Sequence, residues 1–254
     1  KIKKMINNFF KTIHNKYYKF FRFIFFLRYL FAIFFTAIVL FLTIPFFFDY
    51  EKKIEIIKNR LSKSYNFKID KYEKIIFKPL PHPSLELKNV LIKNDLGFSK
   101  FEVKNLRIVP KIFSIYNFEE LQLKKIILKK SNIEIEDLIF ETNLRQLFFQ
   151  KNKLLIDNLN IKILDKNRPL INIENLRYAN FGYNKNIIIG KIFNKKFKTK
   201  IDDNFNIFNF RLLDSGLNIE IIFEKENENL VKGILKSKIL NSNLKFNFEY
   251  NDKT

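Results

Sequence analysis

The sequence predicts a mainly β protein, in which an N-terminal transmembrane helix and a short amphipathic helix precede an elongated, curved antiparallel β-sheet, groove-like or folded into a sandwich. Three observations predict this fold class. A single charge-free apolar run lies near the N-terminus. Beyond it, short alternating stretches are separated by Asn, Asp, Gly and Pro turn clusters. The regular alternation of strands and helices that a parallel sheet needs is missing.

Residues 1–28 form a basic tail, with eight basic residues and no acidic one. Mixed basic and aromatic residues can bind single-stranded nucleic acid through charge and stacking. Beside a membrane helix they more simply bind anionic lipid headgroups. We therefore expect no nucleic-acid partner. The residues that we assign to the membrane surface are Lys11, Lys16, Lys19, Arg22 and Arg28.

Residues 29–48, "YLFAIFFTAIVLFLTIPFFF", predict a transmembrane signal anchor. A helix of this length covers about 30 Å, the thickness of the hydrocarbon core. Core helices of soluble proteins seldom run so far without a polar stripe. The run is also too long for a cleaved signal peptide, and no small-x-small cleavage site follows it. We expect one permanent membrane pass.

The charges on either side of this run predict its orientation. The basic tail lies on the N-terminal side, whereas Asp49 and Glu51 open the other side. Basic segments stay in the cytoplasm, so the tail is predicted to be cytoplasmic and residues 49–254 to lie across the membrane.

Residues 49–66 predict an amphipathic helix, with Asp49 as its N-cap. The apolar face of this helix consists of Tyr50, Ile54, Ile57 and Leu61.

Residues 67–254 predict a β domain. The segment 79–84, "PLPHPS", cannot be regular, because its three prolines lack backbone donors and restrict their neighbours. Helical interruptions are expected at 111–116 and 137–149. The chain opens on Lys1 and stops within a strand pattern, so we expect the domain to continue in a longer protein.

One sequence pattern recurs in this domain, first as "LELKNVLI" at 85–92. The alternation slips by one residue at the fifth position and then resumes. Similar stretches are "FEVKNLRI" (101–108), "LQLKKIIL" (121–128), "INIENLRY" (171–178) and, more loosely, "LLIDNLNI" (154–161). An inserted residue is what a β-bulge requires, and Asn tolerates the left-handed conformation found at such kinks. Repeated bulges bend a sheet into a trough. The predicted bulge sites are Asn89, Asn105, Lys125 and Asn175.

No catalytic or metal-binding motif is recognisable in the sequence. Cysteine is absent, which excludes disulfides and thiol chemistry. The two histidines, His14 and His82, would lie on opposite sides of the membrane. No HExxH, GxSxG or phosphate-loop motif is present. We predict that the protein is not an enzyme and has no catalytic, cofactor or metal site. The absence of Asn-x-Ser/Thr sequons disfavours a glycosylated secretory protein.

The order of tail, anchor, short helix and proline-marked loop, leading into "LELKNVLIKN…FSKFEVKNLRIVPKIFSIYNFEELQLKKIILKKSNIEIE", resembles the N-terminal region of the AsmA family. The later "NLNIKILDKNRPLINIENLRY" is similar to the family's recurring hairpin. The resemblance is firm over about residues 29–180. These motifs are patterns of apolar and small polar residues and contain no catalytic signature.

The resemblance implies a protein anchored in the inner membrane of a Gram-negative bacterium, with its bulk in the periplasm and a part in outer-membrane biogenesis. Larger members of the family look like bridge-type lipid-transfer proteins with a curved β groove. We therefore expect phospholipid to be sheltered or transferred along an apolar groove, with envelope proteins as further partners. The alternative is a scaffold or assembly factor that binds a partner protein through a β edge, without lipid.

The candidates for the wall of a lipid groove are the apolar positions of the repeats. A closed β-sandwich core would give the same alternation, so both readings stay open. The candidate residues are Leu85, Leu87, Val90, Ile92, Phe101, Val103, Leu106, Ile108, Leu121, Leu123, Ile126 and Leu128.

Overall fold

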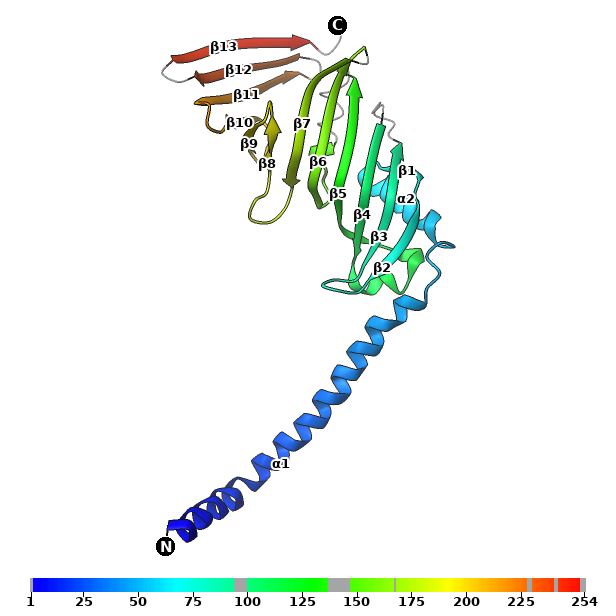
Figure 1. Ribbon diagram of the computed structural model, residues 1–254, viewed down its shortest axis with the longest axis vertical. Coiled ribbons are helices and arrows are strands. Elements are labelled where there is room, and N and C mark those ends of the chain that lie inside the picture. Colours follow the sequence, from blue (N-terminus) through cyan, green and yellow to red (C-terminus); the bar gives the residue numbers. More distant parts are fainter. Residues whose placement is uncertain are drawn as a thin grey trace. The chain divides into compact units, whose positions relative to one another are not determined.

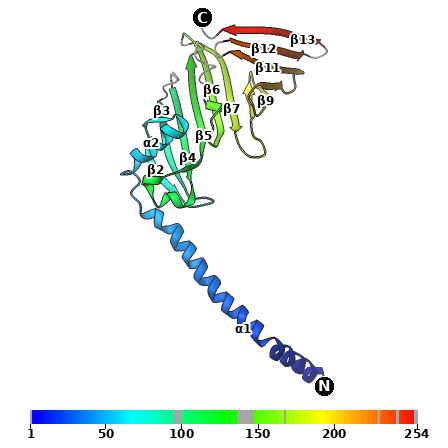
Figure 2. The ribbon, with the colours of Figure 1, turned by 180° about the vertical axis from the view of Figure 1, so that it is seen from behind.

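The fold is that of a computed structural model of the 254-residue chain, shown in Figures 1 and 2. The structure describes residues 2–93, 100–136, 147–166, 168–227, 230–239 and 242–251. Two compact units divide the chain, Lys1–Phe48 and Asp49–Thr254, and each is described by itself.

The first unit is helical. Helix α1 (Ile2–Thr43) continues into a 3₁₀ turn, η1 (Ile44–Phe47), and departs from helical geometry only at Tyr17. The stretch Arg22–Phe47 is long and apolar enough to cross a membrane, which agrees with the predicted anchor but begins seven residues earlier than 29. The hydroxyls of Thr36 and Thr43 donate to carbonyls one turn back, so they add no unsatisfied donors.

Helix α2 (Ile54–Tyr65) opens the second unit. Its predicted apolar face is confirmed, because Tyr50, Ile54, Ile57 and Leu61 are all buried. The predicted N-cap is wrong. Asp49 accepts a hydrogen bond from the backbone N–H of Lys52, in the turn that precedes the helix, and the helix itself begins without a side-chain cap. Asn66 ends it in the left-handed conformation.

One sheet makes up most of the rest of the second unit, and the mainly β, curved fold is as predicted. Its strands follow one another across the sheet in chain order, except that β1 and β2 both pair with β3. The strands are β1 (Lys68–Lys71), β2 (Lys74–Lys78), β3 (Ser84–Lys93), β4 (Lys100–Pro110), β5 (Leu123–Glu136), β6 (Leu154–Asp165), β7 (Arg168–Ala179), β8 (Ile187–Ile192), β9 (Lys195–Ile201), β10 (Ile207–Leu212), β11 (Leu217–Asn227), β12 (Leu230–Ile239) and β13 (Ser242–Asn251).

The pairing is antiparallel with one exception. Strands β5 and β6 run parallel, with Ile126 beside Leu154 and Glu136 beside Leu164. A parallel pair needs a crossover that returns the chain to the starting end of the strand. The chain is therefore back at the starting end of β5 when β6 begins at Leu154, which the alternation pattern gave no reason to expect.

Within the described residues, the connections between strands agree with the segments predicted to be irregular or helical. Residues 79–83 are irregular, and β3 begins at Ser84. Two single 3₁₀ turns, η2 (Ile112–Ile115) and η3 (Phe118–Glu120), occupy the first predicted helical interruption and the residues after it. Of the second, 137–146 lies outside the described residues, and Leu147 and Phe148 are helical.

A line of kinks crosses β3 to β7, at matching positions from β3 to β6 and close to them in β7, where Asn175 donates its backbone N–H to the Asn160 side chain. Asn89, Lys130, Asn158 and Asn175 all have φ between 47° and 66°. The register places Asn89 opposite Lys104, Lys104 opposite Lys130, and Lys130 beside Asn158. At this line, each strand switches which of its alternating side chains point into the core. The polar face of the sheet is hollowed along the same line. The bend is therefore shared by the strands β3 to β7.

The predicted bulge sites can be compared with this line. Asn89 and Asn175 are kinks with positive φ, as predicted. The prediction of a bulge at Asn105 is wrong, because Asn105 pairs in regular register with Lys88 and Lys129 and its φ is not positive. At Lys125 the ladder does shift by one residue, but the extra residue is the preceding Lys124.

Candidate functional site

The structure places the twelve predicted wall residues in a filled core. They lie on one face of β3 to β5 and the adjoining turn, and all are buried except Leu123, which is half-buried. Leu85, Leu106 and Leu128 have no exposed surface. The prediction that these residues line an open lipid groove is therefore corrected, and over these strands the structure matches the alternative of a closed core.

Helix α2 and neighbouring turns fill the space over these strands. Figures 1 and 2 show α2 lying against one face of the sheet. The ring of Tyr65 stacks on Phe67, and Phe67 meets Phe101 edge to face at 5.8 Å. The Tyr65 hydroxyl donates to the carbonyl of Lys153, which joins α2 to the start of β6. The core therefore closes with the chain's own side chains.

The apolar face continues beyond this core onto β10 to β13. Alternation and register carry the same face through Phe208 and Phe210 to Ile219 and Ile221. These side chains are only half-buried, and farther along Leu244 and Phe246 are 43% and 55% exposed. Soluble proteins rarely expose a contiguous apolar surface of this kind without a use for it. We call the described apolar side chains here the C-terminal apolar face: Phe208, Phe210, Ile219, Ile221, Phe223, Leu235, Leu244, Phe246 and Phe248.

An aromatic row organises this face. Phe208 meets Phe223 edge to face at 5.4 Å between ring centroids, and Phe223 meets Phe248 at 5.8 Å. Gly233 of β12 lies directly between Phe223 and Phe248 in the ladder. Because glycine has no side chain, the ring of Phe248 can lie over it and close the row. The row makes a continuous apolar surface across four strands.

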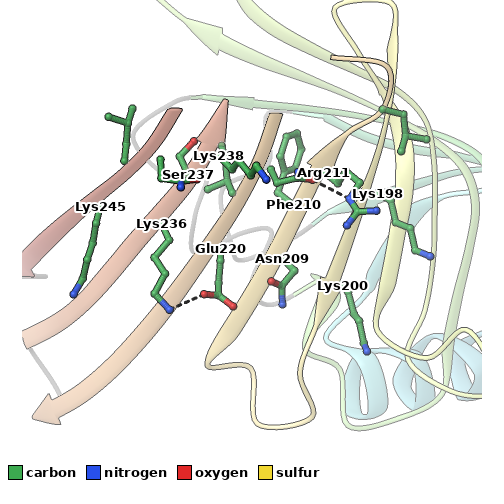
Figure 3. A pocket seen from close by; sticks show the side chains of 15 residues that line it. Lys198, Lys200, Asn209, Phe210, Arg211, Glu220, Lys236, Ser237, Lys238 and Lys245 are labelled. Carbon is green, nitrogen blue, oxygen red and sulfur yellow. Dashed lines mark hydrogen bonds and ion pairs between the residues drawn. The ribbon is translucent and has the colours of Figure 1, made fainter. Parts of the chain in front are cut away.

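The opposite face of the same strands carries cations. A row of directly paired residues runs Lys200, Asn209, Glu220, Lys236 and Lys245, as Figure 3 shows. The next row includes Lys198, Arg211 and Lys238. Together these residues line a hollow of about 940 Å³.

Few of these cations are neutralised within the face. Lys236 pairs with Glu220 at 2.9 Å, and Arg211 donates to the Asn218 amide oxygen at 2.8 Å. In the described part of the chain, Lys198, Lys200, Lys238 and Lys245 have no carboxylate within ion-pair distance. The two faces of β9 to β13 thus differ sharply in polarity.

The predicted membrane-surface residues all lie on α1 and are exposed: Lys11, Lys16, Lys19, Arg22 and Arg28. Among the described residues, no group of three or more His, Asp or Glu side chains could hold a metal ion. His82 lies in the irregular β2–β3 connection, and His14 belongs to α1.

No family model, curated protein or solved structure matches this chain. The faces described above therefore have to be interpreted from their own chemistry.

Sequence reasoning did not distinguish the C-terminal apolar face from the core strands. The stretches "LNIEIIF" and "LKFNFEY" predict β11 and β13, but the apolar residues at their inward positions follow the same alternation as those of the core strands. One available signal was the absence, among the later stretches, of a second amphipathic helix like α2 that could cover them.

Proposed function

We propose that this chain is a membrane-anchored envelope protein that shelters phospholipid acyl chains on its C-terminal apolar face. The resemblance to the AsmA family adds a part in outer-membrane biogenesis and, with other members, lipid transfer. The chain has no proposed catalytic role. Acyl chains would lie along the apolar side chains, and headgroups would stay in water at the margin of the sheet.

One observation carries the proposal. The same face of one sheet is buried over β3 to β5 and only half-buried or exposed over β10 to β13. Removing a Phe or Leu side chain fully from water contributes about 1.5–3 kcal/mol, so an apolar ligand gains from covering this surface. An acyl chain fits because it needs no hydrogen-bonding partners from a face made up mainly of apolar side chains.

The membrane part of the proposal rests on Arg22–Phe47. We propose that this stretch spans the inner membrane of a Gram-negative bacterium, with the basic tail in the cytoplasm and the β unit in the periplasm. Protease added to spheroplasts should then cut the β unit and spare the tail. A protected β unit with a cleaved tail would reverse the topology.

Photo-crosslinking in the full-length chain tests the lipid proposal. Phe246 and Lys245 are neighbours on β13 and are both exposed, but they belong to opposite faces. A photoreactive phenylalanine analogue in place of Phe246 should form adducts with phospholipid, which mass spectrometry identifies. The same analogue in place of Lys245 is the matched control and should form few.

A third position separates the C-terminal apolar face from the core. Leu106 is completely buried, so an analogue there should capture protein and no lipid. Lipid adducts at position 106 and none at 246 would show that the lipid groove lies on β3–β5. An absence of lipid adducts at both positions would remove the lipid function.

A partner-binding scaffold is the second candidate. Strand β13 pairs with β12 along one edge, and among the described residues its other edge has no strand partner. A free edge can accept a strand from another protein. In the crosslinking experiment, this function would give protein adducts at position 246 in place of lipid.

A further inference from the structure

Two segments at one end of the second unit expose large apolar side chains. In the β2–β3 connection, Leu80 is 70% exposed. In η2, Ile112 is 50% and Phe113 is 80% exposed. These three side chains lie apart from the C-terminal apolar face, and the proposed lipid function makes no use of them.

The strand register brings the two segments to the same end of the sheet. Lys78 pairs with Ser84 across the β2–β3 connection, and Leu85 pairs with Ile108 in β4. The β2–β3 connection therefore leaves the sheet beside the point where β4 passes into η2. Figures 1 and 2 show both segments at this end.

The chain also enters the second unit at this end. The ring of Tyr50 stacks on Phe77, which directly precedes Lys78, with 6.0 Å between centroids. It also lies 5.6 Å from Phe118 of η3. Tyr50 is two residues beyond Phe48, where the first unit ends. Two residues of extended chain reach at most about 7 Å, so the covalent tether joins the unit close to these segments.

We propose that Leu80, Ile112 and Phe113 form a membrane-seating patch that inserts into the surface of the bilayer spanned by Arg22–Phe47. The inference rests on the membrane anchorage proposed above and is independent of lipid on the sheet. The short tether holds the patch at high effective concentration near the bilayer. Apolar side chains of this kind settle about 5–10 Å into the boundary between headgroups and acyl chains.

The charges beside the patch are basic. Lys111 is exposed, and Lys78 shares the carboxylate of Glu86 with Lys88. Insertion depends on apolar burial, so zwitterionic vesicles should be sufficient, and anionic lipid should only strengthen it. A seated patch would restrict rotation of the β unit about its tether and so fix which way the apolar face opens.

Single labels in the full-length chain test the proposal. The chain contains no cysteine, so Phe113→Cys, Leu80→Cys, Val39→Cys and Phe193→Cys each carry one polarity-sensitive fluorophore. Phe193 is the matched control, because it is 73% exposed in the β8–β9 turn at the opposite end of the strands. The labelled chains are reconstituted into phosphatidylcholine vesicles containing a nitroxide-labelled phospholipid as quencher.

The labels at 113 and 80 should be quenched at least about half as strongly as the label at 39, because the interface lies within reach of the nitroxide. The label at 193 should keep its intensity. Two positions on separate segments guard against a local effect of either substitution. Quenching at 39 with none at 113 and 80 would overturn the patch and leave the anchor standing. No quenching at 39 would overturn the anchor, and the patch with it.

Discussion

Phe248 of β13 lies directly over Gly233 of β12, its partner in the antiparallel ladder. A Cβ atom at position 233 would meet both the ring of Phe248 and the carbonyl oxygen of Ile222. Glycine is needed here for space, because its φ is not in the left-handed region. The pair completes the aromatic row on the C-terminal apolar face and links its stability to its proposed use.

Gly233→Ala should destabilise the C-terminal strands and move the Phe248 ring. Overpacking of this kind costs about 1–3 kcal/mol. Chemical denaturation of the full-length chain in detergent measures the loss. Ser237→Ala is the control, because Ser237 lies on the same strand and face, and its substitution removes one oxygen and adds no bulk. Equal stability of Gly233→Ala and the wild type would show that the ring has room to shift.

The kink line gives a second prediction. Asn175 has φ of 51°, and a β-branched residue is strained there. Asn175→Val should cost about 1–2 kcal/mol of unfolding free energy. Asn172→Val on the same strand should cost little or be favourable, because Asn172 is exposed and extended. If the two valine variants were equally stable, the kink at 175 would not be under backbone strain.

The kinks show what a local pattern can and cannot predict. Asn89 and Asn175 were predictable because the phase slip and a residue tolerant of positive φ coincide in "LELKNVLI" and "INIENLRY". Lys130 was missed because the next inward position is Ser131, a polar residue that is completely buried and hides the resumed alternation. At Asn105 the composition matched but the ladder stayed in register.

The site was less predictable than the fold for a nonlocal reason. Leu85 and Phe223 both occupy inward positions of alternating strands, and nothing in their own neighbourhoods separates them. Leu85 is covered because other parts of the chain close over its strands, whereas Phe223 stays half-buried. Which part of a face is covered depends on segments distant in sequence. Alternation therefore predicts the face and leaves open what lies on it.

Tyr65 gives a prediction about the closed core. Burial raises the pKa of its phenol to about 12, so at neutral pH the hydroxyl remains a donor to the Lys153 carbonyl. Tyr65→Phe should lower the unfolding free energy by about 0.5–1 kcal/mol, near the low end for a hydrogen bond, because Lys153 still accepts from Ile126. Denaturant titration of both chains measures it. A loss several times larger would mean that the hydroxyl holds α2 in place.

Glu86 gives a prediction about acid stability. Its side chain is 8% exposed and pairs with Lys78 and Lys88. Burial opposes ionisation, but the hydrogen bonds from Lys78 and then Lys88 outweigh it and hold the pKa of Glu86 below its usual 4.5. A carboxyl whose pKa is lowered by folding stabilises the protein above its unfolded-state pKa. That contribution is lost as the pH falls through the folded-state pKa.

Glu86→Gln should therefore cost about 1.5–3 kcal/mol at neutral pH, as expected for hydrogen bonds to a charged group. The difference between variant and wild type should shrink as the pH falls below about 4. Unfolding free energies measured across this range give both quantities. Glu134→Gln is the control, because the Glu134 side chain is 36% exposed and its nearest lysine contact, to Lys162, is 3.8 Å. An exposed pair of this kind contributes at most about 1 kcal/mol, so this variant should follow the wild type. A difference at Glu86 that stayed constant with pH would show that its charge plays no part in holding β2 against β3.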